Sequence, residues 1–163
     1  MIKMLLPACA ALIVFIIYSS CRVVDNGCGY ELDPAIKAPD SEIVRMDKYI
    51  SDSSIANATK HSSGLYYQIL NPGTGNYPTQ CNLVGVTYTG KLINGSVFDA
   101  SSTNIFYSLK DLIFGWRIGL PLIKSGGVIR LYVPPSFGYG QTPVGSIPKN
   151  SILVFDVNLN EVK

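Results

Sequence analysis

The stretch from residue 112 to residue 123 limits the possible folds of this 163-residue chain more than any other segment. It reads Leu-Ile-Phe-Gly-Trp-Arg-Ile-Gly-Leu-Pro-Leu-Ile and contains the single tryptophan, Trp116. Gly115, Gly119 and Pro121 weaken helical continuity, so we expect a helix of no more than about two turns. Because the flanking sequence alternates like β-strands, this helix should cover one face of a sheet and bury its aromatic side chain there. Taken alone, the pattern favours Trp116 as a core residue.

Charge and composition exclude several classes of function. The net charge is only +2 and the basic residues are scattered, which argues against a nucleic-acid partner. There is one histidine, His61, in a polar segment without a catalytic partner, and the four cysteines lack metal-site spacing, so neither a metal nor another cofactor is expected. Few charged residues beside many Tyr, Gly and Pro indicate a β-rich extracytoplasmic protein, and the length suits one domain with an appendage.

Residues 1–20 are predicted to be a signal peptide of the bacterial lipoprotein type. The apolar run from Met4 to Tyr18 has fifteen residues, fewer than the roughly 20 that a membrane-spanning helix needs. Small residues directly precede Cys21, as in lipoprotein cleavage boxes, so Cys21 is the expected lipidation site. The chain would then be anchored in the cell envelope, with the periplasmic side of the outer membrane as the expected location. An ordinary secretory signal and an uncleaved anchor are the alternatives.

Residues 21–63 are predicted to be a tether with a short amphipathic helix at about 41–51, packed on the domain or on a partner. We interpret this region as a spacer from the membrane. A dimerising helix is the alternative, but the helix is short for that purpose, so a monomer is expected. Cys28 lies in the tether and Cys81 lies in the main domain. In an oxidising compartment they could form a disulfide; free or intermolecular thiols are the alternatives.

Residues 64–163 are predicted to form one α+β domain. Strand-like segments fall at 65–70, 84–92, 96–99, 128–133 and 151–161, and Asn94-Gly95 is a strong hairpin signal. Loops are expected at 100–105 and 134–148. The pattern predicts five antiparallel strands wrapped over one short helix, with a site in the loops beside the helix.

Five sequence blocks in this region resemble the FKBP-type peptidyl-prolyl cis–trans isomerases in order and spacing. They are Val86-Thr87-Tyr88-Thr89-Gly90, Phe98-Asp99, Leu112-Ile113-Phe114-Gly115-Trp116, Phe137-Gly138-Tyr139-Gly140 and Leu153-Val154-Phe155-Asp156. The resemblance implies a half-wrapped five-stranded antiparallel sheet around one short helix. It also implies an apolar pocket for a proline ring, proline-containing polypeptides as substrates, and the macrolide inhibitors of the family as ligands.

The resemblance assigns a role to each matching position. The aromatic walls and floor of the pocket would be Tyr88, Phe98, Trp116 and Phe155. Leu112 and Ile113 would line the rim, and the Ile113 backbone N–H would donate to the substrate carbonyl. Asp99 and Tyr139 would make polar contacts, and Ile147 would close the far side. In this context Trp116 is better interpreted as the pocket floor than as a core residue.

Three positions depart from the family pattern. The arginine that often pairs with the aspartate is missing, so Asp99 would bond neighbouring hydroxyls or be more exposed. The rim aromatic falls near Ile105 or Phe106, and Phe114 stands where bacterial relatives often have proline. An alternative function is therefore a proline-binding, chaperone-like module with little or no isomerase activity.

Overall fold

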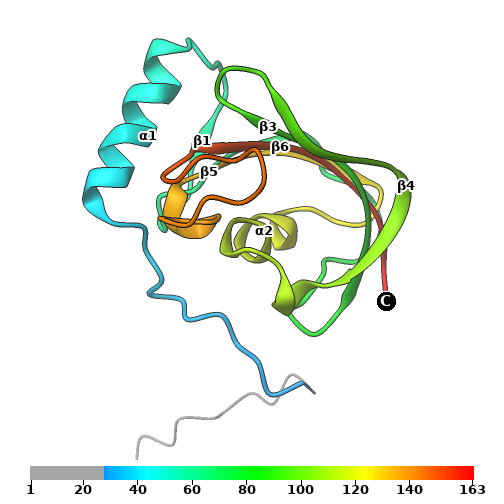
Figure 1. Cartoon of the computed structure of the whole chain (residues 1–163). Helices are drawn as coiled ribbons and strands as arrows, with labels where there is room; N and C mark the ends of the chain where they lie inside the picture. Colours follow the sequence, from blue (N-terminus) through cyan, green and yellow to red (C-terminus); the bar gives the residue numbers. More distant parts are fainter. Residues whose placement is uncertain (1–27) are drawn as a thin grey trace, which may run out of the picture.

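The computed structural model describes residues 28–163. The predicted signal peptide and the predicted lipidation site Cys21 lie outside these residues. The described chain is α+β, with a curved sheet wrapped around a short central helix (Figure 1). The elements are α1 (Asp40–Asp52), β1 (Thr59–Lys60), β2 (Tyr66–Asn71), β3 (Leu83–Leu92), β4 (Val97–Ser108), α2 (Phe114–Gly119), β5 (Gly127–Val133) and β6 (Leu153–Val162).

The sheet has six strands in the order β1-β2-β5-β6-β3-β4, and every neighbouring pair is antiparallel. This confirms the predicted half-wrapped architecture, but the prediction of five strands was one too few. The additional strand is β1, which has only two residues and pairs Thr59 with Tyr67. It lies in the polar segment that contains His61, where two polar residues give no alternating pattern.

Strand β4 corrects a second prediction, since it runs through the expected loop at 100–105 to Ser108. The register against β3 shifts between the pairs Tyr88–Ser101 and Val86–Ile105, so the strand bulges there. Ser101 Oγ donates to Thr103 O at 2.8 Å within the bulge. β4 is one of the two edge strands of the sheet, so polar residues there face solvent at little cost. A polar composition was therefore a poor guide to the end of this strand.

Helix α2 packs closely against β5 because its two glycines face that strand. A Cβ at Gly115 would lie 2.6 Å from Val133 Cγ1, and one at Gly119 would lie 2.5 Å from Leu131 Cδ2. Neither distance is compatible with a normal contact. The glycines therefore bring the helix onto the sheet, in addition to weakening the helix. After Gly119 a 3-10 turn over Leu120–Leu122 follows, where Pro121 lies.

Helix α1 covers the face of β5 that is turned away from α2, together with the loop before β6 (Figure 1). Its one fully buried residue, Met46, belongs to a cluster with Tyr132 and Ile152. Glu42 accepts hydrogen bonds from Ser136 N and Ser136 Oγ at 2.9 and 2.8 Å. This helix was predicted to pack on the domain or on a partner, and in the structure it packs on the domain. None of the helices in residues 28–163 has the length and apolar character that crossing a membrane requires.

The segment before α1 is attached to the domain at both of its ends. A disulfide joins Cys28 to Cys81, which precedes β3, with a Cα–Cα distance of 5.5 Å. At the other end, Ala38 is 2% exposed and its N–H donates to Ser63 O at 2.8 Å. Between these points Leu32 and Ile36 pack against the hydrophobic core. Residues 28–38 therefore lie on the surface of the domain.

Asp156 on β6 makes the one ion-pair network of the described sheet. Its carboxylate accepts from Arg130 Nε at 2.5 Å and from Lys91 Nζ at 3.3 Å. Burial acts to raise the pKa of Asp156, but the two cations outweigh it and hold the pKa below the usual 3.8. A carboxylate with a lowered pKa stabilises the fold above about pH 3.8, and this contribution is lost as the pH falls through the folded-state pKa.

We expect Asp156→Asn to lower the free energy of unfolding by about 1–2 kcal/mol at pH 7, because charged hydrogen bonds are lost from a half-buried site. The difference from the parent chain should be smaller at about pH 2.5 than at pH 7, because protonation removes the charge of the carboxylate. Urea unfolding at both pH values measures it. Asp52→Asn is the control, because the pair of Asp52 with Lys48 is exposed on α1 and should contribute little. A loss that does not change with pH would contradict the prediction.

Candidate active-site pocket

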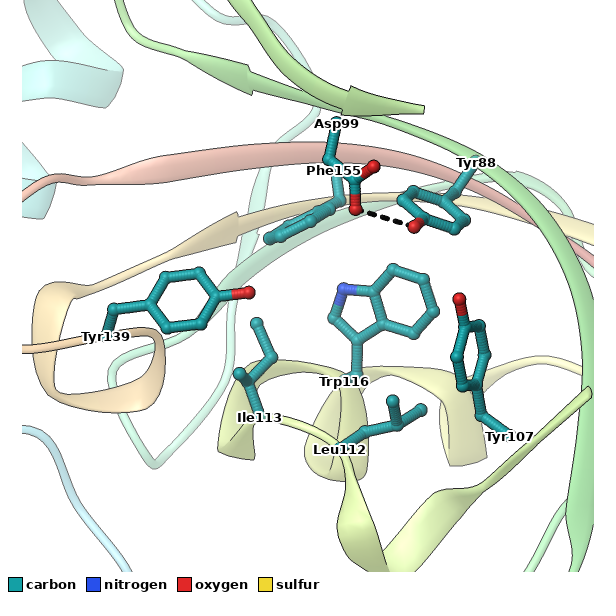
Figure 2. A pocket seen from close by; sticks show the side chains of 8 residues that line it. All are labelled: Tyr88, Asp99, Tyr107, Leu112, Ile113, Trp116, Tyr139 and Phe155. Carbon is teal, nitrogen blue, oxygen red and sulfur yellow. Dashed lines mark hydrogen bonds between the residues drawn. The ribbon is translucent and has the colours of Figure 1, made fainter. Parts of the chain in front are cut away.

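A pocket with a cavity volume of about 170 Å³ lies between α2 and the concave face of the sheet. Figure 2 shows side chains from β3, β4, β6, the α2 segment and the loop after β5 converging on it. The lining residues are Tyr88, Asp99, Tyr107, Leu112, Ile113, Trp116, Tyr139 and Phe155. Seven of the nine residues predicted for the pocket or its rim are therefore in one place, together with Tyr107.

The indole of Trp116 forms the base of the pocket and is only 4% exposed. It makes edge contacts with Tyr88 and Phe155, at ring-centroid distances of 5.2 and 5.4 Å and interplanar angles of 84° and 90°. Such perpendicular contacts are favourable for aromatic rings and hold all three in fixed orientations. The indole Nε1 is buried and has no hydrogen-bond partner among the described residues. It lies on the side of the ring toward Tyr139 and Asp99 (Figure 2).

Phe98 and Ile147 were predicted to line the pocket, but neither is among its lining residues. The Phe98 ring packs edge-on against Phe155, with centroids 5.5 Å apart. It occupies the space beside Gly90, where a Cβ would lie 2.6 Å from Phe98 Cζ. Ile147 is 5% exposed and belongs to the main hydrophobic core. Phe98 therefore supports the lining residue Phe155, and Ile147 is a core residue.

Tyr107 was missed by the sequence analysis, which looked for a rim aromatic at Ile105 or Phe106. In β4, Ile105 and Tyr107 share one face of the strand, while Phe106 points to the other face and is 38% exposed. Phe106 contacts Lys163 Nζ there, 4.0 Å from the ring centroid. The alternation starting at Ile105 could have identified Tyr107. The loop that we predicted at 100–105 concealed this strand pattern.

Asp99 has a hydroxyl partner in place of the missing arginine. Tyr88 Oη donates to Asp99 Oδ2 at 2.6 Å, as the dashed line in Figure 2 marks. Burial raises the pKa of Tyr88 well above its ordinary value, and the hydrogen bond to Asp99 and the nearby Tyr107 hydroxyl raise it further. Tyr88 is therefore a neutral donor at all physiological pH values. The structure has both environments that were considered for Asp99, because the carboxylate is hydrogen-bonded to a hydroxyl and the residue is exposed.

Tyr139 directs its hydroxyl toward the centre of the pocket (Figure 2). Burial raises the pKa of Tyr139, and the charge of Asp99 adds to the effect. The phenol is therefore protonated near neutral pH and can donate a hydrogen bond to a ligand. The residue is 38% exposed, so part of Tyr139 remains in contact with solvent.

Ile113 is the residue immediately before α2, and its extended backbone leaves the N–H outside the helical hydrogen bonds. Its C=O accepts from the N–H groups of Trp116 and Arg117 at 3.0 and 3.2 Å. Its own N–H has no acceptor among the described residues. The pocket rim thus offers an unused backbone donor beside the side chains of Ile113 and Leu112. Within residues 28–163 no cluster of His, Cys, Asp or Glu is suited to a metal ion.

Comparisons with known proteins place this geometry in a family context. The family model described as "FKBP-type peptidyl-prolyl cis-trans isomerase" matches residues 75–160, which is more than half of the chain. An FKBP-type peptidyl-prolyl cis-trans isomerase FkpA from Buchnera aphidicola (subsp. Schizaphis graminum) is 44% identical over 115 residues, covering 68% of this chain and 46% of its own length. The chain spans about half or less of the curated relatives it matches first.

Solved structures agree with the sequence matches. The crystal structure of FkpA from Escherichia coli has a TM-score of 0.69 and 38% identity, covering 76% of this chain and 60% of its own. A peptidyl-prolyl cis-trans isomerase from Pseudomonas syringae has a TM-score of 0.67 and 28% identity. That match covers 78% of this chain and 98% of the solved one, so nearly all of that smaller isomerase has a counterpart here.

Proposed function

Because this chain belongs to the FKBP-type peptidyl-prolyl cis–trans isomerase family, we propose that it catalyses rotation about X–Pro bonds in polypeptides and so assists the folding of exported proteins. The observation that carries the proposal is the pocket itself. Buried aromatic rings surround a small cavity, and an unused backbone N–H and a protonated phenol lie at its edge. We propose residues 64–163 as the catalytic domain and residues 21–63 as the segment that joins it to a membrane.

The chemistry of X–Pro rotation suits such a pocket. Amide resonance sets a rotation barrier of about 20 kcal/mol, and unaided isomerisation takes tens to hundreds of seconds. No bond is made or broken, so the reaction requires neither a nucleophile nor a proton transfer. The twisted amide in the transition state has lost resonance and is less polar than the planar one. An apolar pocket therefore favours the twisted form over the planar form more than water does.

The aromatic residues are proposed to bind the proline ring. Trp116 would lie beneath the ring as the floor, with Tyr88 and Phe155 as walls and Tyr107 at the rim. Their mutual edge contacts at 5.2 and 5.4 Å support this role, because a rigid pocket loses little entropy when the ring enters. Phe98 and Ile147 would act indirectly, by holding the wall residues in place.

The polar residues are proposed to orient the peptide on each side of the proline. The Ile113 N–H would donate to a substrate carbonyl, and Tyr139 Oη would donate to a second acceptor of the substrate. Asp99 would act through Tyr88. Its carboxylate accepts a hydrogen bond from Tyr88 Oη at 2.6 Å and so fixes the orientation of the Tyr88 ring. Leu112 would contact the apolar side chain that precedes the proline. Each donor is protonated near neutral pH, so activity should vary little between about pH 6 and 8.

The isomerase activity is tested by adding the purified full chain, in mild detergent, to a Leu-Pro peptide enriched in the cis form. We expect acceleration of the cis-to-trans conversion, and loss of that acceleration when a macrolide inhibitor of the family is added. Tyr139→Phe should lower kcat/KM by about five- to tenfold, because one hydrogen bond contributes about 1 kcal/mol. If the folded chain binds the peptide but gives no acceleration, the chaperone-like alternative replaces the proposal.

We also propose that the protein works outside the cytoplasm, anchored by a lipid on Cys21 to the periplasmic side of the outer membrane. The sequence before Cys21 supports the anchor, and the Cys28–Cys81 disulfide supports an oxidising compartment. A docked segment of residues 28–38 would keep the pocket domain close to the membrane surface. Within this arrangement we propose a monomer.

Lipidation is tested by expressing the full chain in a bacterium fed with a labelled fatty acid. We expect the label on the parent chain and its absence after Cys21→Ala, with the variant chain released into the soluble periplasmic fraction. Cys28→Ala is the matched control and should retain the label. An unlabelled parent chain found in the soluble fraction would instead indicate an ordinary secretory signal.

A further inference from the structure

A groove runs along α1 on the outer face of the sheet, the face that is turned away from α2. Two cavities of about 380 and 250 Å³ form it, and Leu92 and Ile93, at the turn between β3 and β4, line both of them. Because the two cavities share this wall and both border α1, they are neighbouring parts of one groove, which we call the hairpin groove. None of its lining residues lines the aromatic pocket, so a ligand here would not need the isomerase site.

The floor and the wall of the hairpin groove give it the same length. The floor runs along the start of β6 from Ile152 to Asp156, where alternate residues share one face of the strand over about 13 Å. The wall runs along α1 from Arg45 to Ser53, two steps of four residues on one side of the helix, over about 12 Å. A groove of this length suits an extended segment of about four or five residues.

One end of the hairpin groove carries more positive than negative charge. Lys91 and Arg130 line it beside a single carboxylate, Asp156, which accepts from both cations. Their side chains are 36% and 37% exposed, and none of their nitrogen atoms is among the buried unpaired atoms of residues 28–163. The remaining N–H groups are therefore open to a ligand. The Tyr132 hydroxyl at this end donates to Gln68 Oε1 at 2.8 Å and adds no charge.

The other end of the hairpin groove holds Arg45, which is exposed. One of its Nη groups donates to the C=O of Asn150, which holds the side chain at the groove wall. None of the ion pairs within residues 28–163 includes Arg45. Between the two ends the wall is apolar, and Ile93 there is 54% exposed. The described groove thus presents positive charge at both ends and an exposed apolar side chain between them.

This order of charges favours a polypeptide over a membrane surface. The groove lies where α1 ends beside the turn between β3 and β4, and the blue segment that begins at residue 28 lies at the opposite end of the domain (Figure 1). The proposed anchor, Cys21, precedes that segment, so the groove faces away from the anchored side. A phospholipid headgroup also carries its negative charge at one point, whereas the groove offers two separated positive ends.

We propose that the hairpin groove binds an extended, acidic segment of an incompletely folded polypeptide. One carboxylate of the segment binds the Nη groups of Arg130 and the ammonium of Lys91, and a second carboxylate binds Arg45. An apolar side chain between them packs on Ile93. In an extended chain residues i, i+2 and i+4 share one face, so an acidic, an apolar and an acidic residue at alternate positions fit the groove. The segment needs no proline, unlike the proposed substrate of the aromatic pocket.

The peptide acetyl-Glu-Ser-Leu-Ser-Glu-amide has this pattern and is the probe. It is titrated into the ¹⁵N-labelled full chain in mild detergent, and the amide signals of Ile93 and Gly95 are followed. We expect saturable shifts with a Kd of about 0.1–1 mM, and the Trp116 Nε1–H signal should stay in place. Replacing both Glu by Gln removes the charges, and replacing Leu by Ser removes the apolar side chain. Each change should weaken binding about fivefold or more.

Three variants locate the binding site. Lys91→Gln and Ile93→Ser change partly exposed residues of the groove, and each should weaken binding about threefold or more. Lys124→Gln is the control and should leave binding unchanged, because it removes a positive charge in the loop before β5, outside the groove. A chain without isomerase activity should still bind the probe, so failure of the proposed function would not affect this result.

Three outcomes would overturn the proposal. The first is the absence of any response of Ile93 and Gly95 at about 5 mM probe. The second is equal binding of the Glu and Gln peptides, or a shift of the Trp116 signal alone, which would place the probe in the aromatic pocket. The third is a response of Ile93 and Gly95 to a short-chain anionic phospholipid but not to the peptide, which would make the groove a membrane contact.

Discussion

Trp116→Leu is expected to lower kcat/KM for a Leu-Pro peptide about ten- to a hundredfold while the chain remains folded. Tryptophan buries roughly 150–250 Å² of surface, and leucine leaves a substantial part of that floor empty. A loss of about 50–100 Å² of apolar contact corresponds to about 1.4–2.7 kcal/mol, which is a factor of ten to a hundred in rate. The edge contacts that orient Tyr88 and Phe155 are lost with the indole, so the walls also lose their support.

The control must separate damage to the pocket from damage to the fold. Met46→Ala removes a fully buried side chain under α1, in a cluster with Tyr132 and Ile152 that does not line the pocket. Such a substitution typically costs about 2–5 kcal/mol of stability. Its kcat/KM per folded molecule should nevertheless equal that of the parent chain, with folded fractions measured by circular dichroism. If both variants lose activity in proportion to stability, Trp116 is a core residue and not the floor of an active site.

The features predicted correctly from the sequence are those where side-chain identity and local geometry agree. Asn94-Gly95 identified the hairpin between β3 and β4, and Gly95 indeed has a positive φ of 88°. The spacing of Ile43, Met46 and Ile50 identified α1, which the structure extends by one residue at each end of the predicted range. Both signals are short-range, because they depend on a few neighbouring residues.

The incorrect predictions concern features that depend on contacts between segments far apart in the sequence. β1 forms only because β2 lies beside it, and β4 continues through polar residues because β3 pairs with it on one side. The assignment of Tyr107 to the pocket required β4 to continue past Asp99, and the polar residues at 100–104 gave no sign of that continuation. Likewise, the contact of Gly115 and Gly119 with β5 could not be inferred from the sequence. A glycine in a helix indicates only a lower helix propensity and not which strand the helix contacts.

Removing the disulfide with Cys28→Ala and Cys81→Ala together is expected to lower the free energy of unfolding by about 3–4 kcal/mol. The two cysteines are 53 residues apart, and the loop that they close restricts the unfolded chain strongly, which in the chain-entropy model gives about 4 kcal/mol. The melting temperature should fall by roughly 8–15 °C for a chain of this size. Differential scanning calorimetry under oxidising conditions measures both quantities.

The same experiment shows how far the effect extends into the folded domain. Because Tyr30 lies against Arg117 and Leu32 packs on the core, release of Cys28 should loosen the segment over α2. The amide hydrogens of residues 28–36 should then exchange faster, while those of β5 and β6 keep their protection. Each single variant should match the double variant, and dithiothreitol should bring the parent chain to the same stability. A parent chain whose melting temperature does not respond to dithiothreitol would show that the two cysteines are not joined in solution.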